Sequence, residues 1–128
     1  MQEYNPLFDL DIQWWLALDE DERVAAVLDY HEKADVEPPD ENMHALLHAV
    51  VENQVALGGA APTESVLHRL VEEKLDRHDA VHAIASVLAN YLYGALCNND
   101  AEVSNDDYYA ALEKLTAEKW LRGEYSKD

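Results

Sequence analysis

Apolar residues recur along most of this chain at the three- and four-residue spacing of an α-helix, and no run of strict alternation indicates a strand. Val24, Val27 and Leu28 show this spacing, which predicts a first main helix at about residues 19–33. An aromatic-rich stretch at residues 12–18 precedes it and is expected to form a short helix that packs on the body of the protein. These first elements already indicate a helical protein.

Further helices are predicted between residues that start or stop helices. They are expected at about residues 40–57, 63–74, 76–97 and 104–122. The expected breaks are Val36–Asp40 with its two prolines, the pair Gly58-Gly59, and the run Asn98–Asp100. Side chains that accept hydrogen bonds from the first helical turn are expected at the helix starts. The predicted N-caps are Asp19 (with Glu22 as its partner), Thr63, Asp76 and Ser104.

This order of elements predicts an all-α protein, a compact bundle of about five helices with an N-terminal arm. The arm is assigned to residues 1–18, the bundle to residues 19–122 and a short tail to residues 123–128, within a single helical domain. A chain of 128 residues is long enough to bury a core of its own. That core is expected to contain Val27, Leu46, Leu47, Val50, Leu67, Leu70, Ile84, Leu88 and Leu92.

The charge balance excludes some classes of partner. There are 27 acidic residues and nine basic ones, for a formal net charge of −18. Phosphate groups repel such a surface, so we expect no nucleic-acid partner and no binding to anionic membranes. The acidity is interpreted as favouring solubility; adaptation to high salt and attraction of cations are alternatives that one sequence does not separate.

Three features bear on localisation. The segment MQEYNPLFDLD has neither the basic region nor the apolar region of a secretory signal, and no apolar run has the length of a membrane span. A single cysteine, Cys97, excludes an internal disulfide and fits a reducing compartment. We therefore expect a cytoplasmic protein.

Four of the six histidines form two H-x-x-x-H pairs, His44 with His48 and His78 with His82. Residues four apart lie on the same face of a helix, so each pair directs two imidazoles the same way. The two helices are expected to lie side by side, which would bring the four rings together, as in metal centres of helical bundles. Glu52 continues the first stripe and is predicted as a fifth or bridging ligand. Such a set suits Zn, Fe or Ni.

Two other interpretations of the histidines stay open. They could form a structural polar seam, in which each ring bonds singly to backbone or to another ring, or the two pairs could fail to meet. His31 and His68 lack a partner at this spacing and are interpreted as half-buried surface residues rather than ligands.

His78-Asp79-Ala80-Val81-His82 also approximates the H-E-x-x-H motif of zinc hydrolases, with aspartate in place of glutamate. The aspartate side chain is shorter, and an acid in the first turn of a helix also favours the helix dipole. We predict no catalytic residue. A metal-dependent hydrolase is a minor alternative, and whether the protein is an enzyme stays open.

A second class of function is a non-catalytic interaction module, with a homodimer as the simplest partnership and an unknown protein as the other. It is motivated by aromatic residues near both ends of the chain, a type enriched at interfaces. These residues are Trp14, Trp15, Tyr108, Tyr109, Trp120 and Tyr125.

At the histidine pairs the chain resembles a bacterial family called domain of unknown function 1841. The resemblance covers about residues 42–90 and rests on HALLHAVVENQ and RHDAVHAIASVL, while WWLALDEDERVAAVLDYH matches more loosely. The chain departs from the family at Asp79, where the family tends to carry glutamate. The resemblance implies a small helical protein in which the histidine pairs are a shared feature, and it supplies no activity.

Overall fold

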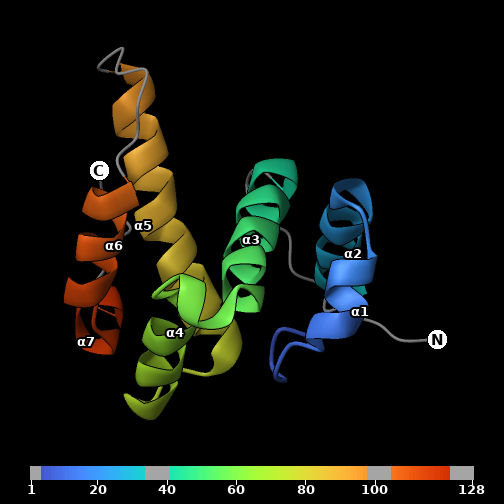
Figure 1. Ribbon diagram of the computed structural model, residues 1–128, viewed down its shortest axis with the longest axis horizontal. Coiled ribbons are helices and arrows are strands. Elements are labelled where there is room, and N and C mark those ends of the chain that lie inside the picture. Colours follow the sequence, from blue (N-terminus) through green and yellow to red (C-terminus); the bar gives the residue numbers. More distant parts are fainter. Residues whose placement is uncertain (1–3, 34–40, 98–104, 122–128) are drawn as a thin grey trace.

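The computed structural model describes residues 4–33, 41–97 and 105–121, and the regular elements in these ranges are all helices (Figure 1). The prediction of an all-α bundle is confirmed. The expected breaks at Val36–Asp40 and Asn98–Asp100, and the predicted cap Ser104, lie outside the described residues. The elements are α1 (Ile12–Ala17), α2 (Glu20–Lys33), α3 (Glu41–Ala56), the 3-10 helix η1 (Gly58–Ala60), α4 (Thr63–Glu72), α5 (Arg77–Cys97), α6 (Asn105–Lys114) and α7 (Ala117–Leu121).

Local hydrogen bonds set the ends of several helices, as predicted. The backbone N–H of Glu22 donates to Asp19 Oδ1 at 2.8 Å, and the N–H of Asp19 donates to Glu22 Oε1 at 2.9 Å, a reciprocal capping box. Asp76 Oδ1 accepts from the N–H of Asp79 at 2.8 Å and so caps α5. Helix α3 stops before Gly58, whose φ of +60° lies in the left-handed region that glycine adopts without strain.

The predicted cap at Thr63 is wrong. Pro62 occupies the N-cap position of α4, and Thr63 is the first helical residue. Its buried hydroxyl donates instead to Gln54 Oε1 at 2.8 Å, which ties the start of α4 to α3.

The single helix predicted at 104–122 is divided into α6 and α7. Thr116 Oγ1 accepts from the N–H of Lys119 at 3.1 Å and starts α7 anew. The N–H of Ala117 donates to Glu73 Oε1 at 2.8 Å, so the break is fixed by a side chain that follows α4. A contact with a distant segment therefore decides where this helix ends.

Helix α3 occupies the middle of the molecule, with α2 on one side and α5 on the other (Figure 1). It also contacts α1 and α4, and α5 in turn packs against α4 and α6. Although α5 has 21 residues, neither it nor another helix in the described ranges is long and apolar enough to cross a membrane.

The buried apolar residues form two clusters. The larger one joins α4, α5 and α6 to one face of α3 and includes Leu70, Ile84 and Leu112. The smaller one surrounds Trp15 and Val27 and joins the N-terminal segment, α1 and α2 to α3. Both clusters meet at α3, so this helix has buried faces toward each half of the molecule.

Two predicted core residues are exposed: Leu46 by 45% and Leu92 by 40%. Leu47 and Val50 are half-buried, whereas the remaining predicted core residues are buried. The reason in α3 is that the stripe containing His48 and Glu52 faces the interior, both side chains being fully buried. The leucine-rich face of this helix is therefore turned partly toward solvent.

Candidate metal centre

The two predicted histidine pairs meet between α3 and α5, and a fifth histidine joins them. His44 and His48 come from α3, His78 and His82 from the first half of α5, and His31 from the last turn of α2. Ring centroids of His48 and His78 are 5.1 Å apart, and those of His31 and His48 are 5.2 Å apart.

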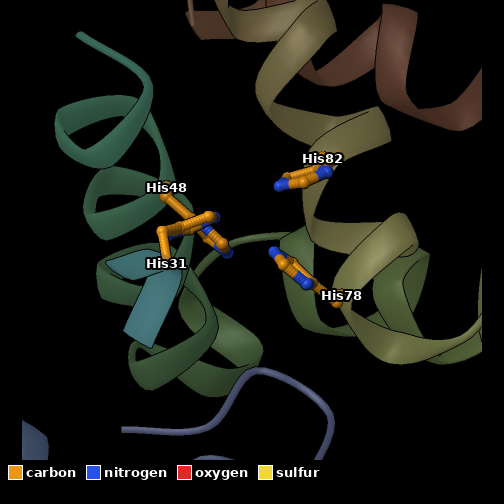
Figure 2. A group of neighbouring side chains, drawn as sticks. All are labelled: His31, His48, His78 and His82. Carbon is orange, nitrogen blue, oxygen red and sulfur yellow. The ribbon is translucent and has the colours of Figure 1, made fainter. Parts of the chain in front are cut away.

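Four of these residues converge on a common point. His31, His48, His78 and His82 each offer one ring nitrogen, and these four atoms all lie within 4.8 Å of one another. Figure 2 shows the rings of His31 and His48 facing those of His78 and His82. In a tetrahedral zinc site with Zn–N distances of about 2.0–2.1 Å, nitrogens lie about 3.3 Å apart. The cluster would need to contract by about 1.5 Å at most to reach that geometry.

His44 belongs to the cluster in a different way. Its Nε2 lies 3.0 Å from Nε2 of His82, and its ring centroid lies 4.9 Å from that of His31. It is not among the four residues whose nitrogens converge, although it was predicted as a ligand and His31 was not. His68 is exposed on α4.

Three nitrogens of the cluster are buried without a hydrogen-bond partner among the described residues: His31 Nε2, His48 Nδ1 and His78 Nε2. Buried polar atoms in folded proteins are nearly always paired, and each unpaired one costs about 1–3 kcal/mol. These three atoms lie on residues that converge on one point, so a common ligand could pair with them.

The hydrogen bond of His31 fixes which nitrogen carries its proton. Nδ1 lies 2.8 Å from the carbonyl oxygen of Val27, one turn earlier in α2. A carbonyl oxygen only accepts, so Nδ1 of the neutral ring must carry the hydrogen. The lone pair is then on Nε2, the unpartnered atom.

Tyr4 and Glu52 fix the proton of His48 in the same way. The hydroxyl of Tyr4 donates to Glu52 Oε2 at 2.5 Å and lies 3.3 Å from His48 Nε2. Burial, with the Glu52 charge as the next cause, raises the pKa of Tyr4, so the hydroxyl keeps its hydrogen. Because that hydrogen is used on Glu52, Tyr4 can only accept from Nε2 of His48. The lone pair of His48 is therefore on Nδ1.

Glu52 can accept the hydrogen bond of Tyr4 in this position because an ion pair with Arg77 fixes its carboxylate. Both carboxylate oxygens accept from the guanidinium at 2.8 Å, a bidentate ion pair buried from solvent. Arg77 also donates to the carbonyl oxygen of Pro6 at 3.0 Å. Glu52 was predicted as a fifth or bridging ligand, but the structure places its carboxylate between Arg77 and Tyr4, outside the converging set.

Burial favours the neutral form of four imidazoles in the cluster. It is the largest cause that lowers the pKa of His44, His48, His78 and His82, and neighbouring imidazoles lower each further. The pKa of His78 falls to about 4 and that of His82 to about 3. Neutral imidazole is the form that binds a metal ion, so these rings need not lose a proton at neutral pH.

Asp79 does not join the cluster. It is exposed in the first turn of α5 and is not among the residues whose ligand atoms converge. Burial of part of the side chain, with the charge of Asp76 as a second cause, raises its pKa. The position fits the helix-end role of an acid better than the water-orienting acid of a zinc hydrolase.

Sequence reasoning missed His31, Tyr4 and Arg77. His31 carried a signal, because it follows Val27 by four residues in the apolar register of α2 and so lies on the buried face of that helix. Tyr4 and Arg77 carried none that points to this site, because the residues they contact there are far away in the sequence. Tyr4 lies 44 positions from His48, and Arg77 lies 25 positions from Glu52.

Comparison of the chain with models of protein families, with curated proteins and with solved structures finds no match.

Proposed function

We propose that this protein binds one divalent transition-metal ion through His31, His48, His78 and His82. The observation that carries the proposal is the convergence of four ring nitrogens within 4.8 Å of one another. Four neutral nitrogen donors suit Zn²⁺, Fe²⁺ or Ni²⁺. Glu52 is left out of the ligand set because Arg77 and Tyr4 occupy its oxygens.

The pattern of hydrogen bonds favours a metal site over a structural polar seam. A seam would pair each ring nitrogen with backbone or with another ring. The contacts of His31 with Val27 and of His44 with His82 are of that kind. They nevertheless leave three buried nitrogens unpaired within the described part of the chain, and two of these have a lone pair fixed by neighbouring groups. Metal coordination would use those lone pairs.

Elemental analysis of protein purified without chelator, followed by titration of the apoprotein with zinc, nickel and ferrous ions, tests this proposal. We expect one equivalent of bound metal and a gain in unfolding free energy of about 2.7 kcal/mol at a hundredfold excess over Kd. His31→Gln should weaken binding at least tenfold, because a ligand is removed. His68→Gln is the matched control and should bind normally, since His68 is exposed on α4.

Two results would contradict the proposal. One is less than about a tenth of an equivalent of metal together with no stabilisation by any of the three ions at a large excess. The other is equal metal affinity in His31→Gln and His68→Gln. In either case the histidine cluster would be interpreted as a structural polar seam.

A second candidate function is self-association as a homodimer. Of the aromatic residues that suggested it, Trp15 and Tyr108 are buried. Trp14, Tyr109 and Trp120 are partly buried against the core, and Tyr125 lies outside the described residues. The observation in its favour is a set of exposed apolar side chains in and before α1, with Phe8 exposed by 69%. Its other members are Leu7, Ile12 and Leu16. Sedimentation of wild type and of Phe8→Ser at tens of micromolar tests it, because a monomeric wild type would exclude this interface.

The resemblance to domain of unknown function 1841 leads to one further proposal. Both histidine pairs lie in the closely resembling stretches, and His31 is the last residue of the loosely resembling stretch WWLALDEDERVAAVLDYH. We propose that members of that family share the whole four-histidine set, so that a histidine accompanies the two pairs at the position of His31.

A further inference from the structure

One part of the histidine cluster is buried from solvent, and another part lines a cavity. His31 and His48 are buried, and the Tyr4 hydroxyl sits against His48 Nε2. His44 and His82 are half-buried and line a cavity of about 190 Å³. Metal sites with a purely structural role are closed, whereas sites that bind or transform a ligand keep a position open to it. The position of this cavity therefore matters for what the metal could do.

The cavity is small and is lined mainly by apolar side chains, with few polar groups. Its walls come from α3, α5 and α7 and include Leu47, Ala89 and Trp120. The lining residues with polar side-chain groups are His44, His82, Ser86 and Trp120. Ser86 already donates to the carbonyl oxygen of His82 at 3.0 Å, and Trp120 carries only a donor on a large apolar ring. The histidines, which also belong to the cluster, are therefore the groups best placed to hold a ligand of a few non-hydrogen atoms.

His44 and His82 are paired in a way that metal binding would change. Their Nε2 atoms lie 3.0 Å apart, so one of them donates and the other accepts. A ring nitrogen that binds a metal has no lone pair and no hydrogen left for another partner. Coordination through Nε2 of His82 would thus release Nε2 of His44 at the wall of the cavity. His44 then becomes a hydrogen-bonding group beside the metal rather than a ligand.

Charge indicates which class of ligand would enter. The proposed ligands are all neutral imidazoles, and the nearby carboxylate of Glu52 is already paired with Arg77. A divalent ion would therefore keep its double positive charge. Such a centre favours a small anion, including hydroxide formed from bound water. Fe²⁺ sites commonly keep open positions beside their protein ligands, whereas four nitrogens complete a zinc tetrahedron.

We propose that the metal centre takes a small anionic ligand in the cavity beside His44 and His82, bound to the metal and hydrogen-bonded by His44. This inference rests on the proposed metal binding and adds an open coordination position to it. It also favours a metal that accepts more than four ligands over zinc.

The test uses the full chain loaded with Co²⁺, whose visible spectrum reports its coordination, and azide as the probe anion. Cobalt is first titrated to establish its stoichiometry, and azide is then added to the loaded protein. We expect a saturable change in the cobalt spectrum while cobalt stays bound. Ala89→Phe, which places a ring in the cavity, should weaken azide binding at least tenfold at unchanged cobalt stoichiometry. Ala25→Phe is the matched control on exposed α2 surface and should behave as wild type.

The outcomes separate the two proposals. Absence of cobalt binding would overturn the metal site itself. Normal cobalt binding with an unchanged spectrum, or with azide removing the cobalt, would overturn the open position and leave the metal site standing. Equal azide affinity in Ala89→Phe and Ala25→Phe would exclude entry through this cavity. His44→Ala is a second variant: retained cobalt with weaker azide binding supports the role given to His44, and loss of cobalt would show that His44 is a ligand instead.

Discussion

The two sides of α5 pack against the interior with different kinds of side chain, apolar on one side and polar on the other. Toward α4 and α6, it packs in an apolar cluster that contains Leu70, Ile84 and Leu112, all fully buried. Toward α3 its first half presents His78 and His82 to the other imidazoles, next to the buried pair of Glu52 and Arg77. The first region gains free energy from every apolar group it buries. The second holds charges and unpaired nitrogens that cost free energy.

The two regions differ in what they contribute to stability. Three unpaired nitrogens at about 1–3 kcal/mol each would consume a large part of the 5–15 kcal/mol by which typical proteins are stable. Apolar residues of similar volume would avoid that cost. Histidines in such a place are understandable if a ligand uses their nitrogens, as the proposed metal coordination would.

The largest effect is expected from breaking the ion pair of the histidine region. Arg77→Met leaves Glu52 buried and uncompensated, which should lower the free energy of unfolding by about 3–5 kcal/mol. Urea denaturation of the apoprotein measures it. Lys33→Met is the control, because the pair of Lys33 with Asp29 is exposed and should contribute less than about 1 kcal/mol. Adding Glu52→Leu to Arg77→Met should recover much of the loss, and a loss of under 1 kcal/mol in Arg77→Met would refute the buried-charge account.

A cavity created in the apolar region should lower the free energy of unfolding nearly as much, but it should leave metal binding by the histidines unchanged. Leu70→Ala is expected to lose about 2–5 kcal/mol, because Leu70 is fully buried. Val71→Ala, at a position 41% exposed, is the matched control and should lose well under 1 kcal/mol. Calorimetric titration with metal should give wild-type affinity for both variants while they are folded. A weakened affinity in Leu70→Ala alone would mean that the two regions are coupled.

Acid should destabilise the apoprotein through the histidines. Folding lowers the pKa values of four of them, His44, His48, His78 and His82, and those of His78 and His82 fall to about 4 and about 3. The unfolded chain therefore binds more protons than the folded one below the ordinary histidine pKa of about 6.5. The contribution of these rings to the free energy of unfolding is therefore fully present above about pH 6.5. It is lost as the pH falls toward the folded-state pKa values. Between pH 7 and 5.5 we expect a loss of about 1–3 kcal/mol in total, reduced from the ideal sum because several rings are half-exposed.

Urea midpoints across this range check that expectation. The double variant His78→Gln with His82→Gln should show a shallower decline, since two of the titrating rings are gone. Lowering pH also reduces the repulsion within a chain of net charge −18, which acts in the opposite direction. A midpoint that rises as pH falls to 5.5 would show that this repulsion outweighs the buried imidazoles.

The smallest change in stability, and the largest in binding, is expected from His48→Leu. Leucine removes the unpaired Nδ1 and fills a fully buried position, while Tyr4 keeps its hydrogen bond to Glu52. The apoprotein should change by less than about 1 kcal/mol or become more stable. Metal binding should weaken at least tenfold, because one of four donors is gone. Thermal unfolding with chelator and with metal gives both values, and a destabilisation of more than about 2 kcal/mol would mean that His48 is a structural residue.

Local sequence signals were sufficient for most helices and for the pairing of the histidines. The capping box of Asp19 and Glu22 and the cap at Asp76 depend on residues three positions apart, and the structure has both. Position along a helix also ensures that His78 and His82 share a face. Local signals do not predict a helix boundary that is set by a contact with a residue far away in the sequence. The division of the last predicted helix depends on Glu73, which binds the N–H of Ala117.

The sequence by itself determined that this is a helical protein and that two helices each present a pair of imidazoles. Only the tertiary structure decided which face of α3 turns inward. A leucine stripe competes there with one that carries His48 and Glu52, and periodicity alone favours burying the leucines. The polar stripe can be buried because Arg77 neutralises Glu52, and Tyr4 orients His48. The same packing brought His31 into the cluster and left His44 at the cavity, since contacts between helices depend on residues that no local pattern connects.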